Sequence, residues 1–227
     1  MTIDILPDEV LLEIFNLYRQ SFGNQRGFER AWNNKNGWFK LAHVCHNWRS
    51  IVLSSPSRLR LRLYFAPNSS TAAATLEYLS HLPIIVDYSK APWDATIVNN
   101  WTSALSHPDR VCSIAIRGSP DNYTHQISEA LGVPFPALEN VLFQNMGRVD
   151  PIYLAPSFLT SIQSLQHLRI NGGSLRSFLP LLSVSTSLVD LSLSFCTIFA
   201  SRKKDHFLPI SNVCLTCVIS TCPHSLP

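Results

Sequence analysis

The chain has 227 residues, of which 46% are hydrophobic and only 15% are charged, with a net charge of +3. This mild charge and the lack of a long basic run argue against a nucleic-acid-binding protein. No stretch approaches the roughly 18 apolar residues required to span a membrane. The first residues also lack the basic and then apolar pattern of a signal peptide. We therefore expect a cytoplasmic or nuclear protein that binds neither nucleic acid nor membrane.

The first predicted element is a helix that begins near Pro7. Proline suits the first turn of a helix, and the following Asp8 and Glu9 suit its positive end. Apolar residues then recur at the spacing of one helical face, at Leu11, Ile14, Phe15 and Tyr18. A second apolar stripe runs beside the first, at Val10, Ile14 and Leu17. One stripe is enough to pack a surface helix, so the wider apolar face indicates a partner. Complete burial of the helix within this chain's own fold is the alternative.

A second helical pattern covers residues 41–52, after a polar, Gly- and Asn-rich insertion at about 19–38 that we expect to be a loop. Its apolar residues recur at spacings of three and four, at Leu41, Val44, Cys45, Trp48, Ile51 and Val52. The same predicted helix carries His43, Cys45 and His46. The two histidines could share a face, but no third metal ligand accompanies them, so we expect an ordinary surface pair.

Two short motifs in these segments, Leu6-Pro7 and Val44-Cys45-x-x-Trp48-Arg49, resemble the F-box family. An F-box is a short helical module that docks the Skp adaptor of SCF-type ubiquitin ligases. The resemblance covers about residues 4–60 and implies a set of adaptor-binding residues, namely Leu6, Pro7, Ile14, Val44, Cys45 and Trp48. The insertion departs from the family pattern, as does Arg60 after Leu59, where related sequences often carry Trp.

Leucine and arginine alternate strictly over residues 58–63, so the leucines are expected on one face and the arginines on the other. A helix is then predicted at about 72–82, a short strand at 83–88 and a further helix at 95–105.

Apolar triplets with the pattern L-x-x-L-x-L begin at residues 111, 138, 165, 188 and 210, so the starts are 27, 27, 23 and 22 residues apart. These periods lie within the 20–29 residues of leucine-rich repeats. We expect an α/β protein, with a helical F-box-like module at residues 1–60 and an irregular leucine-rich-repeat-like solenoid at 61–227. An ordinary α/β domain with buried strands is the alternative. The tail after the last triplet is short for another repeat, so we expect either a C-terminal truncation of this domain or a partner that covers its end.

The positions between the repeated apolar residues align in columns that are mostly polar and would line one face of the solenoid. The candidate substrate-binding residues on this face are Arg117, Asn140, Gln144, His167, Arg169 and Asp190. The arrangement resembles fungal, basidiomycete-type F-box proteins, in which the repeat domain holds the substrate. Polarity required only for solubility is the alternative interpretation.

The C-terminal sequence Cys214-x-x-Cys217-x4-Cys222-x-His224 is similar to a zinc site in its ligand types. We expect no zinc there, because the first two cysteines overlap an apolar repeat strand and the last spacing is tight for tetrahedral ligation. Without a secretory signal, we expect the cysteines to be reduced thiols.

Phosphate-cradling, dinucleotide-binding, nucleophile-elbow and zinc-protease motifs are absent from the sequence. We therefore predict no catalytic residues, cofactor or metal. The resemblance implies a substrate-recognition subunit that binds a Skp-type adaptor, through it a cullin scaffold, and an unidentified target protein. An interaction scaffold without ubiquitin transfer is one alternative, and an enzyme with an unrecognised site is another.

Overall fold

The computed structural model describes residues 6–23, 37–65, 67–68, 71–88, 93–118, 121–144, 158, 163–171 and 187–194. It is a mixed α/β structure that divides into two compact units. Unit 1 comprises Met1–Tyr64 with His81–Pro83, and unit 2 comprises Phe65–Ser80 with Ile84–Pro227. Within the described residues, no helix is both long and apolar enough to cross a membrane.

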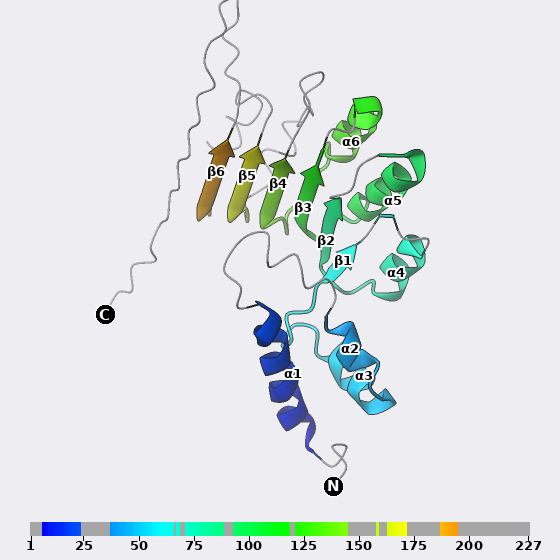
Figure 1. Ribbon diagram of the computed structural model, residues 1–227, viewed down its shortest axis with the longest axis vertical. Helices are drawn as coiled ribbons and strands as arrows, with labels where there is room; N and C mark the ends of the chain where they lie inside the picture. Colours follow the sequence, from blue (N-terminus) through cyan, green and yellow to red (C-terminus); the bar gives the residue numbers. More distant parts are fainter. Residues whose placement is uncertain are drawn as a thin grey trace, which may run out of the picture. The chain divides into compact units, whose positions relative to one another are not determined.

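The described part of unit 1 contains three helices, α1 (Asp8–Gly23), α2 (Phe39–Ala42) and α3 (His46–Ser54), drawn in blue and cyan (Figure 1). The first turn of α1 begins at Pro7, whose carbonyl accepts hydrogen bonds from the amides of Val10 and Leu11 at 3.0 and 3.1 Å. α1 continues to Gly23, so the first part of the predicted loop at 19–38 is helical. Residues 24–36 of that segment lie outside the described part of the chain.

The prediction of one continuous helix over residues 41–52 was wrong, because the chain turns between α2 and α3. His43 is the C-terminal cap of α2, and Cys45 adopts an extended conformation with φ −155° and ψ 173°. The Cys45 Sγ accepts a hydrogen bond from the amide of Trp48 at 3.4 Å, so Cys45 caps the N-terminus of α3. His43 and His46 therefore do not share a helix.

The core of unit 1 forms around Phe15 of α1 and Trp48 of α3, whose ring centroids lie 4.7 Å apart. Other buried side chains on these helices are Leu11, Leu12, Ile51 and Val52. Trp38 is also buried, and its Nε1 donates to the Arg62 carbonyl at 3.1 Å. This contact ties the start of α2 to the segment that follows α3.

The alternating segment at residues 58–63 has the predicted burial pattern but not the predicted regular conformation. Leu59, Leu61 and Leu63 are buried, whereas the arginines between them are exposed or half-buried. Most of the segment is a turn, and Arg60 has a positive φ of 46°. Extended pairing begins only at β1 (Leu63–Phe65), at the boundary of the two units.

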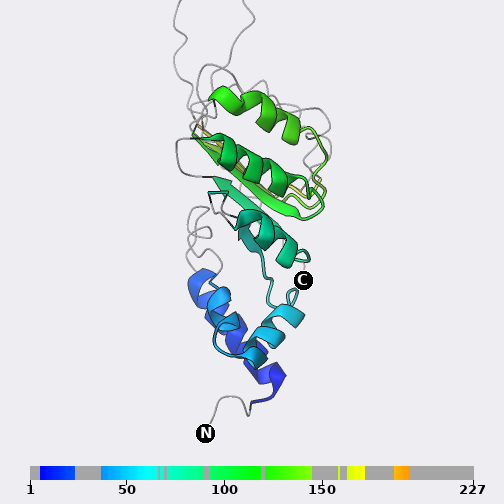
Figure 2. The same cartoon turned by 90° about the vertical axis from the view of Figure 1, so that its right-hand side faces the viewer.

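The remaining elements belong to unit 2. Their strands pair in parallel in the order β2-β3-β4-β5-β6, and β1 precedes β2 in the strand order of the same sheet. Its strands are β2 (Ile84–Tyr88), β3 (Val111–Arg117), β4 (Asn140–Gln144), β5 (His167–Asn171) and β6 (Asp190–Ser194). The connecting helices are α4 (Ala72–Tyr78), α5 (Ala95–Leu105), η2 (Asp121–Tyr123) and α6 (Thr124–Ala130). Helices α4, α5 and α6 lie side by side on one face of the sheet (Figures 1 and 2).

Four of the five predicted repeat triplets fall on consecutive strands of this sheet, and the fifth, at 210, lies outside the described residues. The strand register places equivalent apolar residues side by side. One buried row contains Ile114, Val141, Leu168 and Leu191, and the next contains Ile116, Phe143, Ile170 and Leu193. These two rows provide the apolar core beneath the sheet.

Candidate functional site

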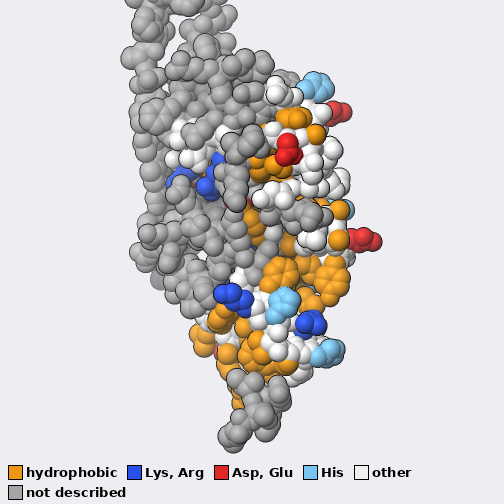
Figure 3. All heavy atoms as spheres, turned by 45° about the vertical axis from the view of Figure 1, so that its right-hand side comes forward, with side chains coloured by type: hydrophobic (Ala, Val, Ile, Leu, Met, Phe, Trp, Pro, Cys, Tyr) orange, Lys and Arg blue, Asp and Glu red, His pale blue; other side chains and the backbone are white. Residues whose placement is uncertain are grey.

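The first candidate surface is an apolar stripe on and just before α1. We define the α1 stripe as Leu6, Val10, Ile14 and Leu17, whose side chains are 37, 43, 39 and 56% exposed. Their spacing of four, four and three residues places them along one side of the helix. The space-filling view in Figure 3 shows apolar side chains, coloured orange, gathered on the surface of unit 1.

The α1 stripe is not required for the packing of unit 1, because another side of the same helix supplies the core. Leu11 and Phe15 are completely buried, and Leu12 is 7% exposed. The sequence therefore places apolar residues both on the packed side of α1 and on the solvent side. Grouped exposed apolar side chains of this kind mark interaction sites in soluble proteins.

The six predicted adaptor-binding residues divide into accessible and structural positions. Leu6, Pro7 and Ile14 are exposed, and Val44, in the turn between α2 and α3, is 57% exposed. Cys45 is half-buried as the cap of α3, and Trp48 is only 8% exposed. The first four can meet a partner directly, whereas the last two position the helices.

Val10 and Leu17 belong to the exposed surface, although the set of site residues drawn from the family motif did not include them. Both are more exposed than Ile14, which was included. The signal that identifies them is the second apolar stripe in the sequence.

Arginines of unit 1 lie near one another at the later part of α1. Burial of the guanidinium lowers the pKa of Arg19, and the neighbouring charges of Arg60 and Arg62 lower it further. The Arg19 Nη2 donates to Asn16 Oδ1 at 3.3 Å. These cations lie beyond the acidic first turn of α1, which carries Asp8 and Glu9.

The second candidate surface is the polar face of the sheet in unit 2. Parallel register aligns Ser113, Asn140, His167 and Asp190 in one row, then Ala115, Leu142, Arg169 and Ser192, then Arg117, Gln144, Asn171 and Ser194. All six predicted substrate-binding residues are half-buried on this one face. Ser113, Ala115 and Leu142 are buried between them, so the centre of the face is less polar than the sequence indicated.

Two contacts between a basic and an acidic side chain lie on this face. The Arg117 Nε is 3.8 Å from Asp87 Oδ1, which is too long for a hydrogen bond between these atoms but close enough for charge attraction. His167 Nδ1 and Asp190 Oδ2 are 3.9 Å apart on neighbouring strands. Each of the two carboxylates on this face therefore has a basic side chain on the neighbouring strand.

Asp87 is a residue that the sequence interpretation missed, and it is only 5% exposed. It lies on β2 beside Ala115 of β3, one strand before the first predicted repeat. The available signal was a single carboxylate within the apolar strand at 84–88.

Among the residues that the structure describes, no three His, Cys, Asp or Glu side chains converge to hold a metal ion. The four C-terminal residues at which we expected no zinc site lie outside the described part of the chain, namely Cys214, Cys217, Cys222 and His224. Comparison of the chain with family models, curated proteins and solved structures gave no match.

Proposed function

We propose that this protein is a substrate-recognition adaptor of an SCF-type ubiquitin ligase, acting in the cytoplasm or nucleus. In this proposal, unit 1 is an F-box-like module that binds a Skp-type adaptor, and through it a cullin scaffold. One observation carries the proposal. Leu6, Ile14 and Val44, which the motif resemblance assigns to adaptor binding, are exposed apolar side chains, whereas Leu11 and Phe15 on the same segment fill the core.

The energetic case depends on several side chains acting together. Complete burial of a Val or Leu side chain contributes about 1.5–3 kcal/mol relative to full exposure. The residues of the α1 stripe and Val44 are only 37–57% exposed, so each can contribute only part of that free energy. Association itself costs at least about 4 kcal/mol. One such contact is therefore insufficient, but the four residues of the α1 stripe together with Val44 offer enough apolar surface for a partner.

Unit 2 supplies the target-binding half of the proposal as a leucine-rich-repeat-like solenoid. Support comes from the repeat periods and from the aligned apolar rows on successive parallel strands. The half-buried polar face would contact the target protein through Arg117, Asn140, Gln144, His167, Arg169 and Asp190. Holding the target near a ubiquitin-charged enzyme would accelerate transfer by proximity.

Isothermal calorimetry between the full chain and a purified Skp-type adaptor tests the docking step. We expect wild-type protein to bind and Val10→Asp to weaken binding at least about 30-fold, the equivalent of about 2 kcal/mol at a hot spot. Val133→Asp is the matched control, because Val133 is 40% exposed in unit 2 and Val10 is 43% exposed in unit 1.

Absence of binding by folded wild-type protein would contradict the proposal, as would equal losses for the two variants. A reconstituted ligase with a co-purified target then tests ubiquitin transfer. Adaptor binding without transfer would identify a scaffold rather than a ligase subunit.

A further inference from the structure

The charges of unit 1 are distributed unevenly along its sequence. Residues 14–64 contain nine Lys or Arg and a single acidic residue, Glu29, so their net charge is +8 in a chain whose total is +3. The acidic residues in the described part of unit 1 are Asp8, Glu9 and Glu13, which all precede that segment. Strong local charge of one sign favours a partner of the opposite sign.

Three of these cations, Arg19, Arg60 and Arg62, gather near the later part of α1. Burial lowers the pKa of Arg19, and the charges of Arg60 and Arg62 lower it further, so the three guanidinium groups lie close together. Arg19 and Arg62 are half-buried and Arg60 is exposed, so a partner can approach them from solvent. We define these three residues as the arginine cluster.

The described part of the chain leaves the arginine cluster without full compensation of its charge. No described carboxylate forms an ion pair with Arg19 or Arg60. Glu13, the nearest acidic residue before Arg19 in α1, is six positions earlier, about 9 Å along the helix axis. Arg19 Nη2 donates to Asn16 Oδ1, but Arg19 Nε is buried and has no acceptor among the described residues. An anion would therefore stabilise this arrangement.

The local backbone and the helix dipole do not account for the arginine cluster. α1 has no basic residue in its last turn, where a cation would interact favourably with the helix dipole. Arg60 has a positive φ of 46°, which is uncommon for a residue other than glycine and costs free energy. Such strain is concentrated at ligand-binding and switch sites. The turn therefore presents Arg60 at a cost in stability, as expected for a binding residue.

We propose that the arginine cluster binds an acidic segment of a partner protein through its Asp or Glu carboxylates. Planar guanidinium groups match carboxylate oxygens with paired hydrogen bonds, and the bound carboxylates relieve the repulsion among the three cations. Three guanidinium groups accommodate more than one carboxylate, so the partner segment carries neighbouring acidic residues. Nucleic acid is the other common polyanion, but its binding uses cations spread along many phosphates, whereas these arginines gather at one place.

The arginine cluster is distinct from the α1 stripe. Arg19 follows Leu17 by two positions, and residues two positions apart do not share a side of a helix. The inference therefore does not rest on adaptor binding. A negative result for the adaptor or for ubiquitin transfer leaves it unaffected.

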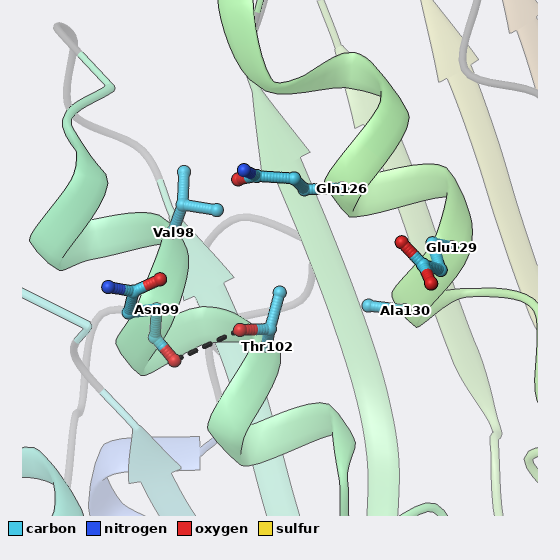
Figure 4. Close-up of a pocket in the computed structure, with 6 residues that line it drawn as sticks. All are labelled: Val98, Asn99, Thr102, Gln126, Glu129 and Ala130. Carbon is cyan, nitrogen blue, oxygen red and sulfur yellow. Dashed lines mark hydrogen bonds between the residues drawn. The ribbon is translucent and has the colours of Figure 1, made fainter.

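Amide chemical-shift mapping of the full chain with the blocked peptide acetyl-tetraglutamate-amide tests the proposal. We expect saturable shifts at residues 16–22 and 58–64, and no shifts with the corresponding tetraglutamine peptide. Added salt should weaken binding, because it screens exposed charges. The hollow between α5 and α6 is an internal reference (Figure 4), since Glu129 is its one charged lining residue and should not attract an acidic peptide.

Two exposed arginines of the same segment provide a matched comparison. Arg60→Gln should weaken tetraglutamate binding about two- to fivefold, the range expected for one exposed ion pair. Arg58→Gln removes an equal charge outside the arginine cluster and should leave the affinity nearly unchanged. Arg60→Gly accepts the positive φ without strain and should lose as much affinity as Arg60→Gln.

Several results would overturn the proposal. These are the absence of saturable shifts in the wild type, equal losses for Arg60→Gln and Arg58→Gln, full binding by Arg60→Gly, and equal shifts at the α5–α6 hollow. Tighter binding of a single-stranded oligothymidylate with the same number of negative charges would also overturn it and would identify a nucleic-acid site instead.

Discussion

Phe15 of α1 and Trp48 of α3 pack with their ring centroids 4.7 Å apart and their planes inclined by 58°. This contact joins the two segments on which the F-box resemblance depends, although 33 positions separate them in the sequence. It also determines which side of α1 faces inward. With Phe15 and Leu11 buried, the side carrying Val10 and Leu17 remains exposed.

Phe15→Ala should destabilise the protein by about 3–5 kcal/mol, because it removes a completely buried ring and leaves a cavity beside Trp48. Leu17→Ala is the control, since Leu17 is 56% exposed and its truncation should change stability by less than about 0.5 kcal/mol. Urea denaturation followed by circular dichroism measures both. Similar losses for the two variants would mean that the inward side of α1 is assigned incorrectly.

The cap of α3 gives a second prediction. Cys45→Ala removes the sulfur that accepts a hydrogen bond from the Trp48 amide, so we expect a loss of about 1 kcal/mol in stability. Cys45→Ser substitutes a stronger capping group and should retain or increase stability. Urea unfolding midpoints compare the three proteins. A Cys45→Ser variant as unstable as Cys45→Ala would show that the cysteine matters through its packing rather than as a cap.

The helix break at Cys45 also shows where sequence reasoning failed. The spacing of apolar residues over 41–52 fits one helix, and cysteine is not among the residues usually associated with helix caps. The apolar period survives the break, so periodicity alone could not reveal it. Arg60 gave a similar error, because its positive φ of 46° interrupts a pattern that otherwise predicts a strand.

Repetition made unit 2 more predictable. The polar columns read from the repeated triplets align in the strand register without a shift. Each column was supported by several equivalent positions, whereas Cys45 and Arg60 were single residues. The burial of Leu142 and Ala115 within the polar face could not be predicted, because burial depends on neighbours distant in the sequence.

The Asp87–Arg117 contact gives a third prediction. Arg117→Met removes the positive charge beside a carboxylate that is 5% exposed, and we expect a loss of about 1–3 kcal/mol in stability. Asp87→Asn alone should also destabilise the protein. The double variant should be more stable than the sum of the two losses predicts, with a coupling energy of at least about 0.5 kcal/mol. A double-mutant cycle from urea unfolding measures this coupling, and strict additivity would show that the two charges do not interact.

The last prediction concerns the stability of the protein at alkaline pH and its dependence on Tyr88. This residue is 3% exposed, and the centroid of its ring lies 4.3 Å from that of Trp93. Burial raises the pKa of the Tyr88 hydroxyl above its usual value of 10.0, and the nearby charge of Asp94 raises it further. The unfolded chain therefore loses this proton at a lower pH than the folded protein does.

Stability contributed by protonated Tyr88 should be complete below about pH 10 and should decrease as the pH rises from there through the folded-state pKa of Tyr88. The free energy of unfolding, measured in urea between pH 8 and 11, should fall less steeply for Tyr88→Phe than for wild type. Tyr78 is 71% exposed, so Tyr78→Phe is the control for the loss of a tyrosine hydroxyl at the surface. Asp94→Asn should give an intermediate slope, because asparagine also caps helices well and can preserve the bond to the Ile97 amide. Titration of the other groups is common to wild type and Tyr88→Phe, so identical slopes for these two proteins would show that burial of Tyr88 does not control the alkaline transition.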